Sequence, residues 1–136
     1  MGNPIAILIA DDNKLMRQTL KLIIAGIHDT RLVGEATNGE EAIALAKEHL
    51  PDIILMDIYM TPVNGFEATR KILKDDPSIK IIGLSLHNQP SYAKNMLQLG
   101  AKGYISKNSN HNEIIKAIQK VAAGEKYIAP DIEEKL

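Results

Sequence analysis

Near the middle of the chain, residues 51–60 read Pro51-Asp52-Ile53-Ile54-Leu55-Met56-Asp57-Ile58-Tyr59-Met60. The apolar run at 53–56 is short and continuous, which is typical of a strand buried on both faces of a parallel sheet. The run stops at a carboxylate, Asp57. This stretch therefore predicts a central strand with an acidic residue at its carboxyl end.

Further strands and helices are predicted on both sides of this stretch. Asn38, Asn64 and Asn110 each stand three residues before a Glu, a variant of the capping box that marks the start of a helix. Apolar residues recur at helical spacing between short apolar runs. The alternation predicts an α/β fold, namely a doubly wound, five-stranded parallel sheet with five helices. The other expected strands lie at 5–10, 32–36, 79–84 and 101–105.

The composition indicates one globular domain. The chain has 136 residues, no Cys and a formal net charge of −1. Such a charge provides no general attraction for nucleic acid, and the lack of Cys excludes disulfides and thiolate chemistry. The first apolar run is too short to cross a bilayer and has no basic flank like that of a signal peptide. We therefore expect a cytoplasmic protein without membrane contact.

Polar side chains follow the predicted strands. Asp11 and Asp12 follow the first strand, Asp57 the third, Ser85 the fourth and Lys107 the fifth. In doubly wound sheets, ligands bind outside the carboxyl ends of the strands. Three carboxylates beside one ammonium leave a net charge of −2, which a divalent cation with oxygen ligands, Mg²⁺ or Mn²⁺, would cancel. The cluster predicts a phosphate site in which a carboxylate can act as nucleophile.

Each residue also has a plainer interpretation. Asp11 and Asp12, with Asn13, could cap the first helix. Asp57 could be an ordinary turn residue, and Tyr104 a half-buried strand aromatic. The joint occurrence of these residues at strand ends favours the phosphate site.

These residues resemble the receiver domain of two-component response regulators, over about residues 4–124. The resemblance implies the flavodoxin-like strand order 2-1-3-4-5. The matching pieces are Ile7-Leu8-Ile9-Ala10-Asp11-Asp12-Asn13, the stretch 51–60 quoted above, Gly65, Ser85, Gly100-Ala101-Lys102-Gly103-Tyr104 and Lys107.

The resemblance implies a role for each residue at the metal site. Asp57 would be the phosphoacceptor. Asp11, Asp12, Asp57 and the backbone carbonyl of Tyr59 would bind Mg²⁺. The domain would assist its own phosphorylation and dephosphorylation only, so we do not expect an enzyme.

Further roles are implied for the phosphoryl group and the switch. Lys107 and Ser85 would contact the phosphoryl group. Ser85 would move towards it and Tyr104 would turn inward, which would reshape the face made by the fourth helix, fifth strand and fifth helix.

Several positions depart from the family pattern. Thr61 and Asn64 stand where the family commonly has Pro and an acidic residue. Leu86 is larger than the usual residue after Ser85 and should narrow access to the phosphoryl group, while Tyr59 and His87 flank the site and should tune access. Asn108 replaces the Pro that often follows Lys107, so we expect either a trans peptide or a strained cis peptide there.

The C-terminal residues refine the resemblance. Residues 121–132 resemble the exit from receivers that precede a helix-turn-helix DNA-binding domain. We therefore expect a receiver domain at 1–124 and the start of a linker at 125–136. The expected partners are a sensor histidine kinase, a second copy of the chain on phosphorylation, and DNA only through an output domain absent from these residues.

Three other functions compete with that of a phosphate-accepting receiver. An aspartate-nucleophile phosphatase would carry a second Asp two residues after the nucleophile, where this chain has Tyr59. In a flavin-binding module, Asp11 and Asp12 would repel the flavin phosphate, and aromatic residues, which would have to sandwich the flavin ring, make up only 4% of the chain. The third alternative is an interaction module that no longer accepts phosphate, and only an experiment can exclude it.

Overall fold

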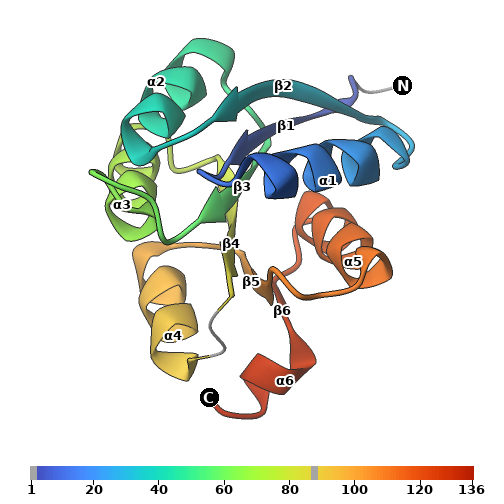
Figure 1. The fold of residues 1–136 in the computed structure, drawn as a ribbon, viewed down its shortest axis with the longest axis vertical. Coiled ribbons are helices and arrows are strands. Elements are labelled where there is room, and N and C mark those ends of the chain that lie inside the picture. Colours follow the sequence, from blue (N-terminus) through green and yellow to red (C-terminus); the bar gives the residue numbers. More distant parts are fainter. Residues whose placement is uncertain (1–2, 87–88) are drawn as a thin grey trace.

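A parallel six-stranded sheet forms the centre of the molecule, in a computed structural model that describes residues 3–86 and 89–136 (Figure 1). The strand order is β2-β1-β3-β4-β5-β6. The strands are β1 (Ile5–Ala10), β2 (Thr30–Ala36), β3 (Ile53–Asp57), β4 (Lys80–Ser85), β5 (Gly103–Ser106) and β6 (Tyr127–Ile128).

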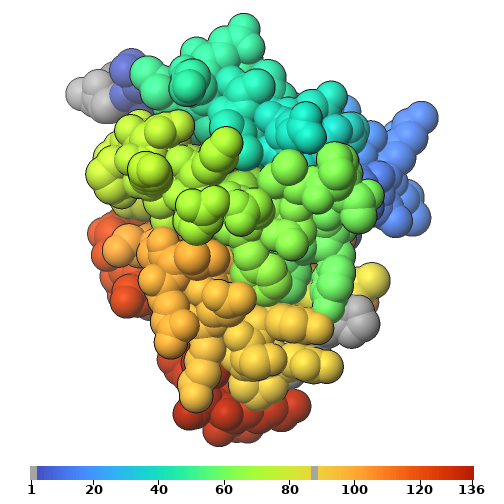
Figure 2. All heavy atoms as spheres, turned by 90° about the vertical axis from the view of Figure 1, so that its left-hand side faces the viewer, coloured from blue at the N-terminus to red at the C-terminus, as the bar shows by residue number. Residues whose placement is uncertain are grey.

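Helices cover both faces of the sheet (Figure 1). The helices α1 (Lys14–Ala25) and α5 (His111–Ala122) lie on one face; α2 (Gly39–His49), α3 (Gly65–Asp75) and α4 (Pro90–Leu99) lie on the other. The short helix α6 (Pro130–Glu133) contacts α4. Figure 2 shows the face formed by α2, α3 and α4, with the C-terminal segment in red below α4.

The continuous apolar runs are buried as predicted. All five residues of β3 are buried, and β3 lies between β1 and β4, where Asp57 pairs with Leu84. Because helices cover both faces, a strand at this position has no polar side. The predicted fold class and the order of the first five strands are confirmed.

The predicted helix caps are also confirmed. The side chains of Asn38, Asn64 and Asn110 each accept a hydrogen bond from the amide three residues later. Asn13 caps α1 in the same way, accepting from the amide of Met16 at 2.9 Å. The plainer interpretation of this segment is therefore correct for Asn13.

The C-terminal segment corrects the expected number of strands. Five strands were predicted, but the structure adds β6 and α6. The amide of Tyr127 donates to the carbonyl of Lys102 at 3.0 Å, and the amide of Ala129 donates to the carbonyl of Tyr104 at 2.9 Å. The side chain of Ile132 is fully buried. A strand of two residues has no alternating pattern, so periodicity could not reveal it.

Two further expectations concern the backbone. Among the described residues, the one cis peptide bond joins Thr61 to Pro62, so the bond between Lys107 and Asn108 is trans. No helix within residues 3–86 and 89–136 is both long and apolar enough to cross a bilayer.

Candidate functional site

The predicted site residues converge at the carboxyl edge of the sheet. Asp57 and Ser85 are the last residues of β3 and β4, whereas Asp11 and Lys107 directly follow β1 and β5. The amide of Lys107 donates to the carbonyl of Ser85 at 2.9 Å, which ties the end of β5 to that of β4. Parallel strands thus bring together four residues that are far apart in the sequence.

Lys107 joins the two buried carboxylates. Its Nζ lies 2.8 Å from Oδ2 of Asp11 and 3.1 Å from Oδ2 of Asp57. Asp11 and Asp57 are 0% and 1% exposed. Two carboxylates taken out of water need such a cation, because their mutual repulsion and lost hydration would otherwise be uncompensated.

Local turns hold the other oxygen of each buried carboxylate. Oδ1 of Asp57 accepts a hydrogen bond from the amide of Tyr59 at 3.0 Å, and Oδ1 of Asp11 accepts from the amide of Asn13 at 2.9 Å. Arg17 supports the second turn, since its Nη1 donates to the carbonyl of Asp11 at 2.8 Å. In each carboxylate, Lys107 contacts one oxygen and a backbone amide binds the other, so both side chains are fixed in orientation.

Gly65 allows α3 to begin against the acidic strand end. A Cβ at this position would lie 2.3 Å from the carbonyl oxygen of Asp57, closer than any real Cβ contact. The amide of Gly65 donates to the carbonyl of Ile58 at 3.1 Å. The loop after β3 can therefore close tightly only with glycine here.

The environment shifts the protonation equilibria of Asp57 and Lys107. Burial and the charge of Asp11 raise the pKa of Asp57 to about 6, although Lys107 and the amide of Tyr59 act in the opposite direction. Burial alone would lower the pKa of Lys107, but its ion pairs with Asp11 and Asp57 outweigh burial and raise this pKa. Lys107 therefore remains a cation at neutral pH. Asp57 is still an anion at neutral pH, but its pKa lies much closer to neutrality than that of an ordinary carboxyl group.

Three carboxylates have the arrangement of a cation site. One oxygen from each of Asp11, Asp12 and Asp57 lies within 4.8 Å of the others, and Asp12 is exposed to solvent. All donors are oxygens, and the ammonium of Lys107 compensates only part of their charge. The donor set and the charge therefore fit a hard divalent cation that keeps some of its waters.

An open cavity of about 260 Å³ lies over Asp57. Tyr59 and Leu86, which are 48% and 60% exposed, form part of its wall. This position agrees with their expected influence on access, which remains a prediction. His87 lies outside the described residues. The residues that line the cavity are Asp12, Asn13, Asp57, Tyr59, Leu86 and Lys107.

The two residues expected to act as a switch, Ser85 and Tyr104, are both buried. Ser85 is 1% exposed, and Tyr104 is 0% exposed rather than half-buried, so its ring already points inward. Burial raises the pKa of Tyr104 to about 12, against an opposing effect of the nearby Ser85 hydroxyl. A Cβ on Gly83 would lie 2.9 Å from Cδ2 of Tyr104, so the ring occupies space that only glycine leaves free.

A contact between two tyrosines near the site was not predicted. The hydroxyl of Tyr59 donates to the hydroxyl of Tyr92, on α4, at 2.5 Å. The two residues are 33 positions apart, and a contact of this kind leaves no local pattern in a sequence.

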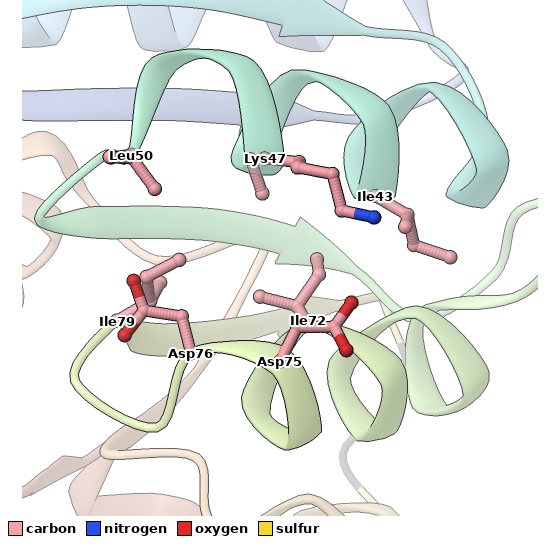
Figure 3. Close-up of a pocket in the computed structure, with 8 residues that line it drawn as sticks. Ile43, Lys47, Leu50, Ile72, Asp75, Asp76 and Ile79 are labelled. Atoms are coloured by element: carbon pink, nitrogen blue, oxygen red, sulfur yellow. The ribbon is translucent and has the colours of Figure 1, made fainter.

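A second cavity is separate from the acidic cluster. It holds about 210 Å³ between α2 and α3, with Ile43 and Ile72 on facing helices (Figure 3). Leu50 and Ile79, which also line it, precede β3 and β4 and so lie near the amino ends of the strands. This cavity is mainly apolar and lies away from the strand ends that carry Asp57.

The fold and the strand-end cluster together describe a signalling receiver. A model of the response regulator receiver domain matches residues 7–119. This match covers more than half of the chain, and the chain therefore belongs to the response regulator receiver family.

Known relatives agree with this assignment. The chain is 38% identical to "Response regulator GacA" of Pseudomonas protegens, over 97% of the chain and 62% of that protein. It is 40% identical to "Transcriptional regulatory protein DegU" of Brevibacillus brevis, over 98% of the chain and 57% of that protein. The chain thus spans about three fifths of the length of these curated relatives.

Solved structures share the fold. A LuxR-family two-component response regulator from Aurantimonas sp. SI85-9A1 superposes with a TM-score of 0.93 at 31% identity, over 97% of this chain and 94% of that one. The isolated REC domain of RcsB from Salmonella enterica serovar Typhimurium, solved with the phosphomimetic BeF₃⁻, gives a TM-score of 0.90 over 98% and 99% of the two chains. Its identity of 22% supports the fold alone.

Proposed function

We propose that Asp57 accepts a phosphoryl group from a sensor histidine kinase or a small acyl phosphate. The observation that carries this proposal is the buried Asp57 carboxylate, with the Lys107 ammonium 3.1 Å away and an open cavity above it. A carboxylate oxygen attacks phosphorus, the bond between phosphorus and the donor breaks, and its electron pair leaves with the donor. Lys107 then holds an oxygen of the transferred group.

The reaction requires Mg²⁺, with Mn²⁺ as a substitute. The ion would be held by the carboxylates of Asp11, Asp12 and Asp57 and the backbone carbonyl of Tyr59. When bound, the ion neutralises charge on the carboxylates and the incoming phosphoryl group. The buried carboxylates and their excess negative charge support this assignment.

The phosphoryl group then acts on the face made by α4, β5 and α5. Ser85, the last residue of β4, and Tyr104, on β5, are both buried. The phosphoryl group is a new anion that would accept a hydrogen bond from the Ser85 hydroxyl. This contact favours one arrangement of the face over another. The domain therefore regulates rather than catalyses turnover of a substrate.

The output of this switch belongs to a longer protein. We propose a receiver at residues 1–124, and a segment at 125–136 that packs on it through β6 and α6 and begins the connection to a DNA-binding transcription regulator domain. The support is the 57–62% coverage of GacA and DegU by the chain. This role places the protein in the cytoplasm with its kinase.

Intact-protein mass spectrometry tests the acceptor. Incubation with acetyl phosphate and Mg²⁺ should add one phosphoryl group, and chelation of the metal should prevent the addition. Asp57→Asn should abolish it, whereas Asp75→Asn, an exposed carboxylate on α3, should not. A gain that survives Asp57→Asn would refute Asp57 as the acceptor, and no gain in the wild type would favour a pure interaction module.

Homodimerisation on phosphorylation is a separate proposal, supported by the family relationship alone. Light scattering should show a doubled mass when a beryllofluoride mimic and Mg²⁺ are added. An unchanged mass would count against dimerisation and leave the acceptor proposal intact.

A further inference from the structure

Tyr59 connects the acceptor residue to the mouth of its cavity. Its amide donates to Oδ1 of Asp57, and the residue lines the cavity that also contains that carboxylate in its wall. The side chain is 48% exposed, so burial alone does not fix the position of the ring. An exposed tyrosine ring ordinarily exchanges between rotamers within nanoseconds.

Tyr92, in the first turn of α4, restrains the Tyr59 ring through two contacts. The Tyr59 hydroxyl donates to the Tyr92 hydroxyl at 2.5 Å. The two rings meet edge to face, with centroids 5.7 Å apart and an interplanar angle of 83°. This geometry is favourable for aromatic pairs.

Tyr92 is itself held in place. Its ring centroid lies 6.1 Å from that of Phe66 on α3, and the side chain is half-buried. The hydrogen bond from Tyr59 therefore ends on a ring anchored between two helices. The hydrogen bond to Tyr92 also raises the pKa of Tyr59, because the neutral hydroxyl is the form that donates it.

We propose that Tyr92 is a positioning residue, which holds the Tyr59 ring as a fixed wall over phosphorylated Asp57 and limits the approach of water. The inference rests on the proposed function of Asp57. In the step concerned, a water oxygen attacks phosphorus and the bond from phosphorus to the Asp57 oxygen breaks. The electron pair returns to the carboxylate, and the proton of the water leaves to solvent.

Three variants test this inference by a double-mutant cycle. Tyr59→Phe and Tyr92→Phe each remove one side of the hydrogen bond and keep both rings. Each single variant should shorten the lifetime of phosphorylated Asp57 about threefold, the effect expected for one neutral hydrogen bond. The double variant should be no faster than either single one, since the same bond is lost.

The lifetime is measured by the loss of the phosphoryl mass after the donor is removed. Cleavage by hydroxylamine, which also has to reach the acyl phosphate, should accelerate in parallel. Thermal unfolding of the same proteins separates access from stability, because a merely structural bond would change the melting temperature without changing the lifetimes. Tyr127→Phe is the matched control, because it removes a hydroxyl on β6 outside the acceptor cavity, and its lifetime should equal that of the wild type.

The outcomes distinguish this inference from the function on which it rests. Equal or longer lifetimes in Tyr92→Phe would overturn it, as would additive effects in the double variant. Phosphorylation of the wild type would still stand in either case. If the wild type gains no phosphoryl group, both the proposed function and this inference fail.

Discussion

Gly83 on β4 and the ring of Tyr104 on β5 lie so close that a Cβ on the glycine would be 2.9 Å from Cδ2 of the tyrosine. The same Cβ would lie 3.2 Å from Cε of Met96 on α4. The inward position of Tyr104 therefore depends on the absence of a single methyl group from the neighbouring strand.

Gly83→Ala should therefore destabilise the protein by about 1–3 kcal/mol, because the tyrosine ring or α4 has to shift. Urea unfolding measures this loss. Gly26→Ala is the control, because its Cβ would meet nothing closer than 3.5 Å and its φ of −89° suits alanine. Equal stabilities of the two variants would contradict the packing argument.

Lys107→Met should remove the cation shared by Asp11 and Asp57. The loss should be about 2–4 kcal/mol at neutral pH, towards the low end because the adjacent cavity admits water. Chemical unfolding provides the measurement. Adding Asp57→Asn to Lys107→Met should recover part of the lost stability, because it removes one buried charge. Lys102→Met is the control, since Lys102 is exposed and its loss should have little effect. A double variant no more stable than Lys107→Met would contradict this view of the ion pairs.

Mg²⁺ should raise the melting temperature, and chelation should reverse the rise. A cation that binds only the folded state stabilises it by about 2.7 kcal/mol at a hundred times its dissociation constant. Asp12→Asn should weaken binding at least about tenfold, since a charged ligand is lost. Titration of the melting temperature with MgCl₂ measures the change, and Asp75→Asn should titrate like the wild type. Identical titrations of wild type and Asp12→Asn would exclude Asp12 as a ligand.

Alkaline pH should destabilise the protein through Tyr104. Its pKa is raised from 10 to about 12 in the folded state, so the unfolded chain releases the proton more readily. This contribution to stability is complete below pH 10 and is lost as the pH rises from 10 towards 12, up to about 2–3 kcal/mol. Unfolding free energies measured across this range should fall less steeply in Tyr104→Phe. Parallel curves for the two proteins would contradict the assignment.

The sequence predicted which elements and residues come together, but not the distances between them, for physical reasons. β3 was evident because a strand covered on both faces must be apolar throughout. The cluster of Asp11, Asp57 and Lys107 was predictable because parallel strands end at a common edge of the sheet. Neither argument specifies distances, so the ion pairs of Lys107 with both carboxylates became known only from the structure.

Features made by long-range contacts were not predictable. The hydroxyl contact between Tyr59 and Tyr92 depends on how α4 packs near the loop after β3, which no local pattern encodes. β6 is formed by two backbone hydrogen bonds to β5 and its preceding residue rather than by a strand-like sequence. Residues 127–133 were therefore expected in a linker, although they pack against the sheet and α4.

The hydrogen bond from Ala129 to Tyr104 has a practical consequence for dividing the protein. A receiver cut after Gly124 would lose β6 and the buried Ile132, leaving the outer backbone groups of β5 bare. An unprotected sheet edge is a template for strands of other molecules. Such a fragment would gain a route to self-association that owes nothing to phosphorylation, so measurements of dimer formation have to retain the C-terminal segment.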